Sequence, residues 1–212
     1  MPTHLPSTEM LADYTSGAAS PGAALLIAAH LTHAPESRRQ VAAMERIGGA
    51  LLADEKPVAM SAAALDDIFA AIDLAPGAPE EPIELDCGPL PKPVIEAVGM
   101  DFEDIQWKFR LPGVSEYELE GFAGEKVSIL RARPGAAIPQ HTHHGREATL
   151  VLAGALQDGG EVFRPGDLAL NDEDDDHRPQ IIGDEVCYCL IVMDGDLHFT
   201  GTFSRALNFL AD

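Results

Sequence analysis

Residues 135–154 read GAAIPQHTHHGREATLVLAG, and three of their side chains have the types and spacing of metal ligands. His141 and His143 are two positions apart, so on an extended segment both imidazoles face the same side. Glu147 follows a tight turn and can return to that side at the start of the next strand. Two imidazoles and a carboxylate suit Zn, Fe, Mn or Ni. The stretch predicts a metal site, and His177 is the best candidate for a fourth ligand from another strand.

The sequence around this stretch predicts many short antiparallel strands. Beyond residue 100, apolar and polar residues alternate, and Pro-Gly or Gly turns separate many of the runs. Such spacing is typical of a β-sandwich or barrel. The expected strands are Ile105–Leu111, Tyr117–Phe122, Val127–Ala132, Glu147–Ala153, Glu161–Phe163, Asp167–Leu170 and Val186–Met193.

The first 75 residues predict four short helices that make a small core of their own. The expected helices run from Ser7 or Thr8 to Ser16, from Pro21 to His30, from Glu36 to Leu52, and from Ser61 onward. The last helix carries Leu65, Ile68, Phe69 and Ile72 on one face, and this spacing permits packing either on its own domain or on a partner.

A proline-rich stretch separates the two patterns. Residues 74–93 hold six prolines, a density that excludes a continuous helix or a central strand. We therefore expect an α+β chain of two domains: a helical domain at 1–75, a linker at 76–94 and an antiparallel β domain at 95–212.

Charge and composition limit the partners of the chain. It has 35 acidic and 14 basic side chains, a net charge of −21. Nucleic acids and anionic membrane surfaces are bound by Lys and Arg, so this balance excludes direct binding to DNA and disfavours an anionic membrane surface. The N-terminus has no basic segment followed by an apolar one, and the longest apolar run, Ala23–Leu31, is about half of a membrane span. We expect a cytoplasmic protein.

Two of the three cysteines lie in one apolar strand. Cys187 and Cys189 share a face of the run VCYCLIV, with Cα atoms about 6.5–7 Å apart by strand rise, which is the upper edge of disulfide geometry. A disulfide there needs local distortion, which suits a redox switch better than a structural crosslink. Two small buried hydrophobic residues are an equally good interpretation.

The stretch that opens this section resembles the cupin signature: a glycine, five residues, His-x-His, three residues, Glu, six residues and a glycine. The second cupin motif matches less closely, because the acidic insert 171–176 lengthens the gap before His177. The resemblance implies a jelly-roll β-barrel in which His141, His143, Glu147 and His177 hold one metal ion.

Almost the whole chain resembles the ChrR-type anti-sigma factors. The resemblance rests on the helical segment, the linker, the cupin motif, His177-Arg-Pro and the Cys-x-Cys strand. It implies that the helices sequester an extracytoplasmic-function sigma factor, and that the cupin binds zinc and responds to singlet oxygen and related oxidants. It also implies that Cys187 and Cys189 are the redox-relevant pair.

One feature departs from that family, whose N-terminal domain normally carries its own zinc on an early His and a His-x3-Cys-x2-Cys motif. Here His4 and His30 are present, but Ala34 and Ser37 replace both cysteines. Two imidazoles alone make a poor zinc site, so we expect no N-terminal metal. The loss also leaves open a cupin sensor that acts on a partner other than a sigma factor.

A second hypothesis is a mononuclear metal enzyme of the dioxygenase or hydrolase type, since cupins host many functions. Open positions on the metal would then accept substrate and oxygen or water. Beyond the metal ligands, the sequence offers only Tyr188 and Arg146 as catalytic groups, and it therefore favours a regulatory binding protein. Cupin barrels commonly dimerise, and the sequence does not decide whether this chain forms a homodimer.

Overall fold

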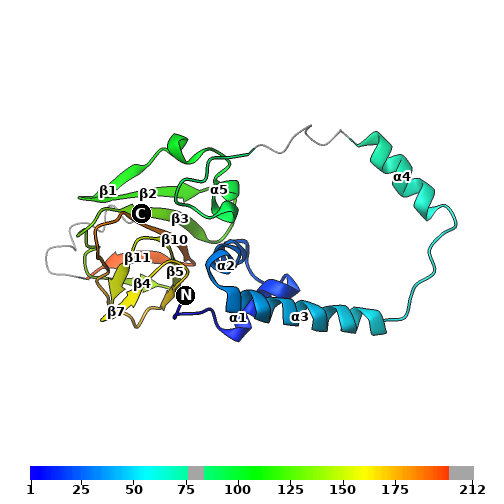
Figure 1. Ribbon diagram of the computed structural model, residues 1–212, viewed down its shortest axis with the longest axis horizontal. Helices are drawn as coiled ribbons and strands as arrows, with labels where there is room; N and C mark the ends of the chain where they lie inside the picture. Colours follow the sequence, from blue (N-terminus) through cyan, green and yellow to red (C-terminus); the bar gives the residue numbers. More distant parts are fainter. Residues whose placement is uncertain (76–83, 201–212) are drawn as a thin grey trace.

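The computed structural model describes residues 1–75 and 84–200, and it confirms the α+β fold class (Figure 1). The helices are α1 (Thr8–Ser16), α2 (Pro21–His33), α3 (Pro35–Asp54), α4 (Ala64–Leu74) and α5 (Lys92–Val98), with a 3-10 turn at Phe102–Asp104. The strands are β1 (Lys108–Leu111), β2 (Val114–Leu119), β3 (Lys126–Ala132), β4 (His141–His144), β5 (Glu147–Ala153), β6 (Leu156–Asp158), β7 (Glu161–Phe163), β8 (Leu168–Asn171), β9 (Gln180–Ile181), β10 (Cys187–Met193) and β11 (Asp196–Phe199). None of the helices in these ranges is long and apolar enough to cross a membrane.

Local chemistry sets the ends of the first helices. Ser7 caps α1 by accepting a backbone hydrogen bond, and Gly17 ends it with a φ of 74°. Helix α2 continues to His33, three residues beyond its expected end. It stops at Ala34 because a residue before proline is disfavoured in the helical region, and Pro35 then begins α3.

A six-stranded antiparallel sheet forms the centre of the β part, in the order β1-β2-β3-β10-β5-β8. Two smaller sheets, β11-β4 and β7-β6-β9, lie beside it. Every expected strand overlaps an observed one, and β5 and β7 have the expected bounds. The strands β4, β6, β9 and β11 were not among the expected strands, because two to four residues carry too little periodicity to be recognised.

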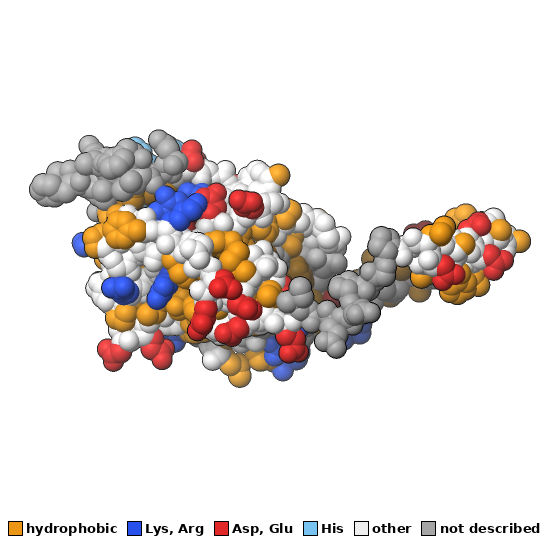
Figure 2. Space-filling view, turned by 90° about the horizontal axis from the view of Figure 1, so that it is seen from above, with side chains coloured by type: hydrophobic (Ala, Val, Ile, Leu, Met, Phe, Trp, Pro, Cys, Tyr) orange, Lys and Arg blue, Asp and Glu red, His pale blue; other side chains and the backbone are white. Residues whose placement is uncertain are grey.

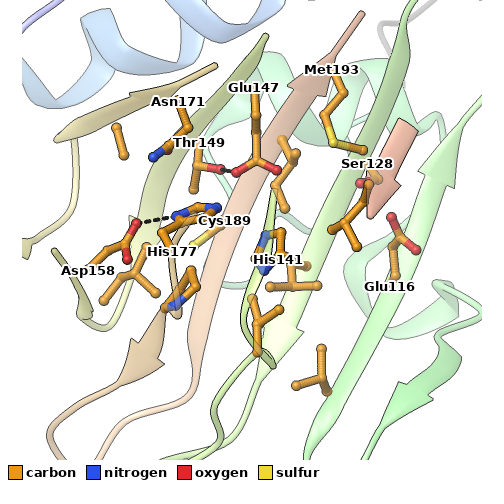
Figure 3. A pocket seen from close by; sticks show the side chains of 18 of the residues that line it. Glu116, Ser128, His141, Glu147, Thr149, Asp158, Asn171, His177, Cys189 and Met193 are labelled. Atoms are coloured by element: carbon orange, nitrogen blue, oxygen red, sulfur yellow. Dashed lines mark hydrogen bonds and ion pairs between the residues drawn. The ribbon is translucent and has the colours of Figure 1, made fainter. Parts of the chain in front are cut away.

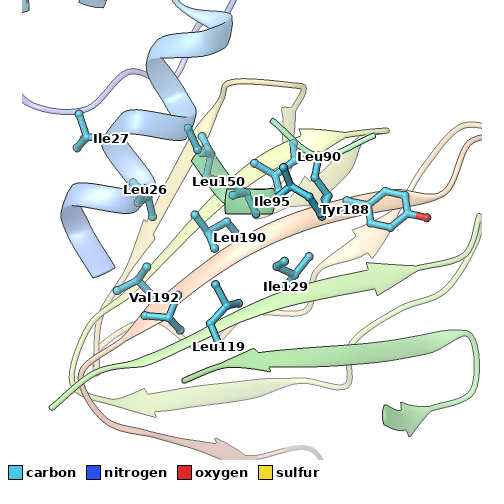
Figure 4. Close-up of a cluster of buried hydrophobic side chains, with 14 of the residues drawn as sticks. Leu26, Ile27, Leu90, Ile95, Leu119, Ile129, Leu150, Tyr188, Leu190 and Val192 are labelled. Atoms are coloured by element: carbon cyan, nitrogen blue, oxygen red, sulfur yellow. The ribbon is translucent and has the colours of Figure 1, made fainter. Parts of the chain in front are cut away.

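Both faces of the six-stranded sheet are buried. On one face, Leu190 of β10 belongs to a cluster that includes Leu26 of α2 and Ile95 of α5 (Figure 4). On the other face, Cys189 of the same strand belongs to a second cluster inside the β part. A strand covered on both sides has no solvent-facing positions, and this explains why Cys187–Met193 is apolar almost throughout.

The N-terminal helices share a core with the sheet. Leu11 of α1, Leu26 of α2 and Val41 of α3 lie in the same buried cluster as the helix-facing sheet residues. Helix α2 carries apolar residues around its circumference, so it is buried between the neighbouring helices and the sheet. The expectation of a separate four-helix core is therefore wrong.

The end of α3 and the whole of α4 project away from this core (Figure 1). Helix α4 buries none of its residues. Its apolar face, which we call the α4 stripe, has side chains that are 52% to 61% exposed: Leu65, Ile68, Phe69 and Ile72. Figure 2 shows hydrophobic and acidic side chains together on this projecting end. The spacing permitted packing of the α4 stripe either on its own domain or on a partner. Within the described residues, no part of this chain covers the stripe.

The proline-rich stretch ends in a helix. Pro76, Pro79 and Pro82 lie outside the described residues, but Lys92 begins α5 with Pro93 in its first turn. Proline is tolerated there because the first amides of a helix have no partner within it. Part of the expected linker 76–94 is therefore helical, and the two domain boundaries stay a prediction.

Candidate metal centre

The three histidines expected as metal ligands meet inside the β part. His141 and His143 point inward from β4, and each is 2% exposed. His177 reaches them because its backbone and that of His141 exchange two hydrogen bonds of 3.0 Å. One ring nitrogen from each histidine lies within 4.8 Å of the others, and the Nε2 atoms of His143 and His177 are 2.9 Å apart. The acidic insert therefore lengthens the loop without moving His177 away from the site.

Two of the rings are held by oxygen atoms at their outer nitrogens. Nδ1 of His141 donates to the carbonyl oxygen of Pro139 at 2.8 Å. Nδ1 of His177 donates to the Asp158 carboxylate at 2.5 Å (Figure 3). A proton on Nδ1 leaves the lone pair of Nε2 free for a metal, and partners of this kind fix the ring and its tautomer. The donor set therefore fits a divalent metal ion.

Glu147 lies beside the histidines, at the first position of β5. It is 7% exposed, and its Oε2 atom is 3.6 Å from Nδ1 of His143. Its Oε1 atom accepts a hydrogen bond of 2.9 Å from Thr149. The three-histidine group does not include this carboxylate, so its role as a fourth ligand stays a prediction.

Burial controls the protonation of the cluster. It lowers the pKa of His141 to about 4, and the neighbouring His177 adds to this effect. Burial also lowers the pKa of His143. Burial acts in the same direction on His177, but the hydrogen bond and charge of Asp158 outweigh it and raise the pKa of that ring. Burial therefore favours the neutral imidazole at His141 and His143, which is the form that binds a metal cation, whereas Asp158 favours the charged form of His177.

A cavity of about 120 Å³ adjoins the histidines. His141, His177 and Glu147 line it, together with Cys189 and apolar side chains from the surrounding strands (Figure 3). Neither catalytic candidate from the sequence lines this space. Arg146 is exposed and pairs with Asp194 at 3.2 Å, while Tyr188 lies in the cluster on the helix side of the sheet.

The two β10 cysteines are buried thiols on the cavity side of the sheet. Each is 1% exposed, and their Sγ atoms are 3.7 Å apart. The hydrogen bond that the Cys189 thiol shares with Cys187, together with burial, raises the pKa of Cys189 well above its ordinary value. Cys189 lines the same cavity as the histidines, so the thiol pair and the candidate metal centre share one space.

Asp158 is a partner of the site that the sequence interpretation missed. Nothing in the sequence spacing identifies Asp158 as a partner, because it lies on the three-residue strand β6 and meets His177 only through the fold.

Replacing Asp158→Asn is expected to weaken zinc binding by about 10- to 100-fold, because the neutral amide no longer holds the His177 tautomer as strongly. Competition with a zinc chelator measures this affinity. Glu161→Gln, on the neighbouring strand and exposed, is the control that should bind as the wild type does. Equal affinities for Asp158→Asn and wild type would contradict the prediction.

His30 links the N-terminal helices to the β part. Its side chain is fully buried, and Nδ1 donates to the carbonyl oxygen of Gly166 at 2.7 Å. The other nitrogen, Nε2, therefore accepts a hydrogen bond from the Ser37 hydroxyl at 2.8 Å. Ser37 is one of the two residues that replace the expected zinc cysteines. One neutral histidine thus joins α2, α3 and the turn before β8.

The same turn binds the N-terminal residues. Asp167 is 2% exposed and accepts backbone hydrogen bonds from Thr3 at 2.5 Å and His4 at 2.8 Å. Burial raises the pKa of Asp167, but these bonds and one from Arg164 outweigh burial and hold it below its ordinary value. His4 and His30 therefore take part in two separate hydrogen-bond networks around the Gly166–Asp167 turn.

The His30 network predicts a loss of stability in mild acid. Burial, opposed by the Gly166 carbonyl, lowers the pKa of His30 from its ordinary value of 6.5. The folded protein therefore disfavours protonation, and stability that is complete above about pH 6.5 is lost as the pH falls. Replacing His30→Gln removes this titration, so the free energy of unfolding should fall less than in wild type between about pH 7 and pH 5. Denaturant unfolding at each pH measures the difference, and parallel curves would contradict the prediction.

The comparisons with known proteins agree with this geometry. Residues 96–196 match the family model described as the ChrR Cupin-like domain. The anti-sigma-E factor ChrR of Cereibacter sphaeroides is 33% identical over 197 residues, which cover 92% of each chain. This chain belongs to the ChrR family of anti-sigma factors. The structure of Rhodobacter sphaeroides SigE in complex with ChrR matches with a TM-score of 0.78 and 30% identity, over 92% of this chain and 100% of that chain. An RmlC-like cupin protein of Ralstonia eutropha matches at 20% identity with a TM-score of 0.42, over 48% of this chain and 71% of that chain.

The ChrR family match confirms the resemblance drawn from the sequence. The matched range 96–196 contains the four expected ligands and both β10 cysteines. The structural match extends over 92% of the chain, well beyond the cupin-like part. The family relation thus covers the N-terminal helices as well, although Ala34 and Ser37 stand at the expected cysteine positions.

Proposed function

We propose that this chain is a cytoplasmic anti-sigma factor whose helices capture an extracytoplasmic-function sigma factor. In this proposal a metal-bound cupin barrel controls the capture. The matching ChrR of Rhodobacter sphaeroides is in complex with SigE, and this supports a sigma factor as the partner. The observation in this chain that carries the proposal is the exposed α4 stripe.

The α4 stripe has the character of a protein-binding surface. Its four large apolar side chains occupy one helix face, and each is more than half exposed. A contiguous exposed apolar face of this kind marks an interaction site. Helix α4 has 11 residues, and isolated helices shorter than about 12–15 residues are marginal in water. A partner that covers the stripe would bury this surface and stabilise the helix.

Acidic residues beside the stripe indicate the charge of the partner. Asp66, Asp67 and Asp73 lie on α4, which has no lysine or arginine. Sigma factors present basic surfaces that face DNA or polymerase, and opposite charges accelerate association. Complex formation should therefore weaken as salt screens these charges.

Co-purification with the cognate sigma factor tests the proposal. The two proteins, expressed together, should leave a sizing column as one complex at low salt and micromolar concentration. Absence of a complex under these conditions would contradict the function. A sigma factor of another class is the control for specificity.

The strand β8 connects the metal centre to the helices and supports a sensor role. It begins after the Gly166–Asp167 turn, which binds His30 and the N-terminal residues. It ends at Asn171, which lies opposite Glu147 in the β5–β8 register. A displacement of Glu147 can therefore be transmitted to the helical contacts through the four residues of β8. Zinc is the proposed metal because it suits the nitrogen and oxygen donors present.

The buried thiols are the proposed site of oxidation under singlet-oxygen-type stress. Cys187 and Cys189 already have their sulfur atoms in contact, so a two-electron oxidant could join them with a small movement of β10. Such a movement would disturb the helix side of the same strand, where Leu190 contacts the α2 cluster. The double variant Cys187→Ser and Cys189→Ser should retain sigma capture but lose oxidant-induced release. Unchanged release would contradict the role of the cysteines.

The cavity beside the histidines favours a second candidate, a mononuclear metal enzyme. The sequence offered Arg146 and Tyr188 as its additional catalytic groups, and neither lines that cavity. Oxygen uptake by iron-loaded protein with a small diketone or thiol separates the two functions. Turnover would favour the enzyme over the regulator.

A further inference from the structure

The cavity side of the sheet carries polar residues that the metal centre does not use. The strand register places Lys126, Met193, Glu147 and Asn171 in one row across β3, β10, β5 and β8. The next row contains Ser128 on β3 and Thr149 on β5. Figure 3 shows Ser128 on the opposite side of the cavity from His177.

Two of these polar groups are buried without a partner. Ser128 is 1% exposed, and its hydroxyl has no hydrogen bond within the described residues. The same holds for the Oδ1 atom of Asn171. A buried polar group without a partner is destabilising, and native proteins avoid such groups. Both residues line the cavity, and the Ser128 hydroxyl can donate a hydrogen bond to an acceptor bound there, whereas the Asn171 Oδ1 atom only accepts.

Once a divalent metal ion is bound, the charges around the cavity favour an anion. Arg110 is paired with Glu116 at 2.6 Å, whereas Lys126 forms no ion pair within the described ranges. The carboxylates of Glu147 and Asp158 face the histidines. Two basic and three acidic side chains line the cavity, so a divalent ion at the centre brings their total charge to about +1. One negative charge on a ligand would neutralise it.

The volume and the remaining lining limit the size of that anion. The cavity has about 120 Å³, and a cavity of about 150 Å³ holds benzene with its six carbon atoms. Leu130, Leu156 and Ile138 form part of its apolar lining. A small inorganic anion would leave this lining without contacts, and a long-chain fatty acid would not fit.

We infer that the cavity binds a short-chain monocarboxylate of about six non-hydrogen atoms or fewer. Lys126 and the Ser128 hydroxyl receive the carboxylate, and the alkyl end contacts Leu130, Leu156 and Ile138. The inference deepens the proposed sensor function, because such a ligand would bind inside the barrel that is proposed to control sigma capture. It rests on a loaded metal centre and not on sigma capture.

Calorimetric titration of the zinc-loaded full-length protein with sodium butyrate tests the inference. Butyrate should bind saturably with a Kd of about 1 mM or lower. Butan-1-ol has the same carbon chain without the charge, and it should bind at least about 10-fold more weakly. Absence of saturable butyrate binding at full zinc occupancy, or equal binding of the alcohol, would overturn the inference.

Three variants test the assigned contacts, each with its zinc content measured. Ser128→Ala and Lys126→Met should each weaken butyrate binding by about 10-fold, because each loses a hydrogen bond to a charged group. Leu130→Phe should abolish binding by filling the cavity. Lys108→Met, an exposed lysine on β1, is the matched control and should bind as wild type does. If both Ser128→Ala and Lys126→Met bind butyrate normally, the metal alone holds the carboxylate, and the assignment is wrong.

Sigma capture is measured separately. Its failure would contradict the proposed function but would not affect the conclusion on butyrate binding.

Discussion

The double substitution Ile68→Asp and Phe69→Asp is expected to weaken sigma-factor capture by about 100-fold or more. Both side chains are more than half exposed in the free chain, so they are available for burial by a partner. Burying an Ile or Phe side chain contributes about 1.5–3 kcal/mol each, and a buried aspartate adds a desolvation cost. Quantitative pull-down or surface-based binding measurements give the change in Kd.

The control for this experiment adds the same charge to the other face of α4. Ala63, the N-cap residue of α4, and Ala70 are exposed, and helical spacing places both on the side away from the stripe, so the control is Ala63→Asp with Ala70→Asp. Their combination should leave the Kd within about threefold of wild type, apart from the general effect of added charge. The fold of the buried core should be unchanged in both double variants, since α4 buries none of its residues. Equal binding by the stripe variant and the control would remove the α4 stripe from the interface.

Loss of the metal is the expected result of replacing His141→Ala together with His143→Ala. Two of the three convergent imidazoles disappear, and a site with one histidine and one carboxylate does not hold a divalent ion firmly. Metal content should fall from about one ion per chain to below about one tenth. The melting temperature should also become insensitive to chelator, because a ligand that binds only the folded state stabilises it.

His144→Ala is the matched control for the metal experiment. His144 is adjacent to His143 but exposed, and it faces away from the cluster. This variant should retain wild-type metal content and chelator response. Full metal content in the His141→Ala and His143→Ala variant would contradict the assigned centre. Under the proposed function, the metal-free variant still captures the sigma factor but no longer releases it when oxidant is added.

The metal motif was largely predictable from the sequence because its chemistry is local. Alternation on an extended strand is a property of the backbone, so His141 and His143 had to share a side. His177 was less accessible to prediction, since the acidic insert obscured its spacing. The structure places it by backbone pairing with His141, an interaction between residues 36 positions apart.

The surroundings of the motif were not predictable, because they depend on contacts distant in sequence. Asp158 at the end of β6 meets His177 from the segment between β8 and β9, and Ser128 faces the cavity only through the β3–β10 register. The apolar α2 helix indicated burial, but its periodicity could not name the sheet as its partner. The family resemblance placed His30 at a ligand position of an N-terminal zinc site, although no metal was expected there, and both of its ring nitrogens form hydrogen bonds with protein oxygens.

By itself, the sequence determined that helices precede an antiparallel β part, which residues are the candidate metal ligands, and the family, since each of these follows from local spacing. Only the tertiary structure decided which faces are covered. It buried α2 against the sheet, left the α4 stripe exposed and enclosed a charged cavity beside the histidines. The physical reason is that burial and electrostatics depend on which distant segments come together, and a local pattern specifies that a face is apolar without specifying what covers it.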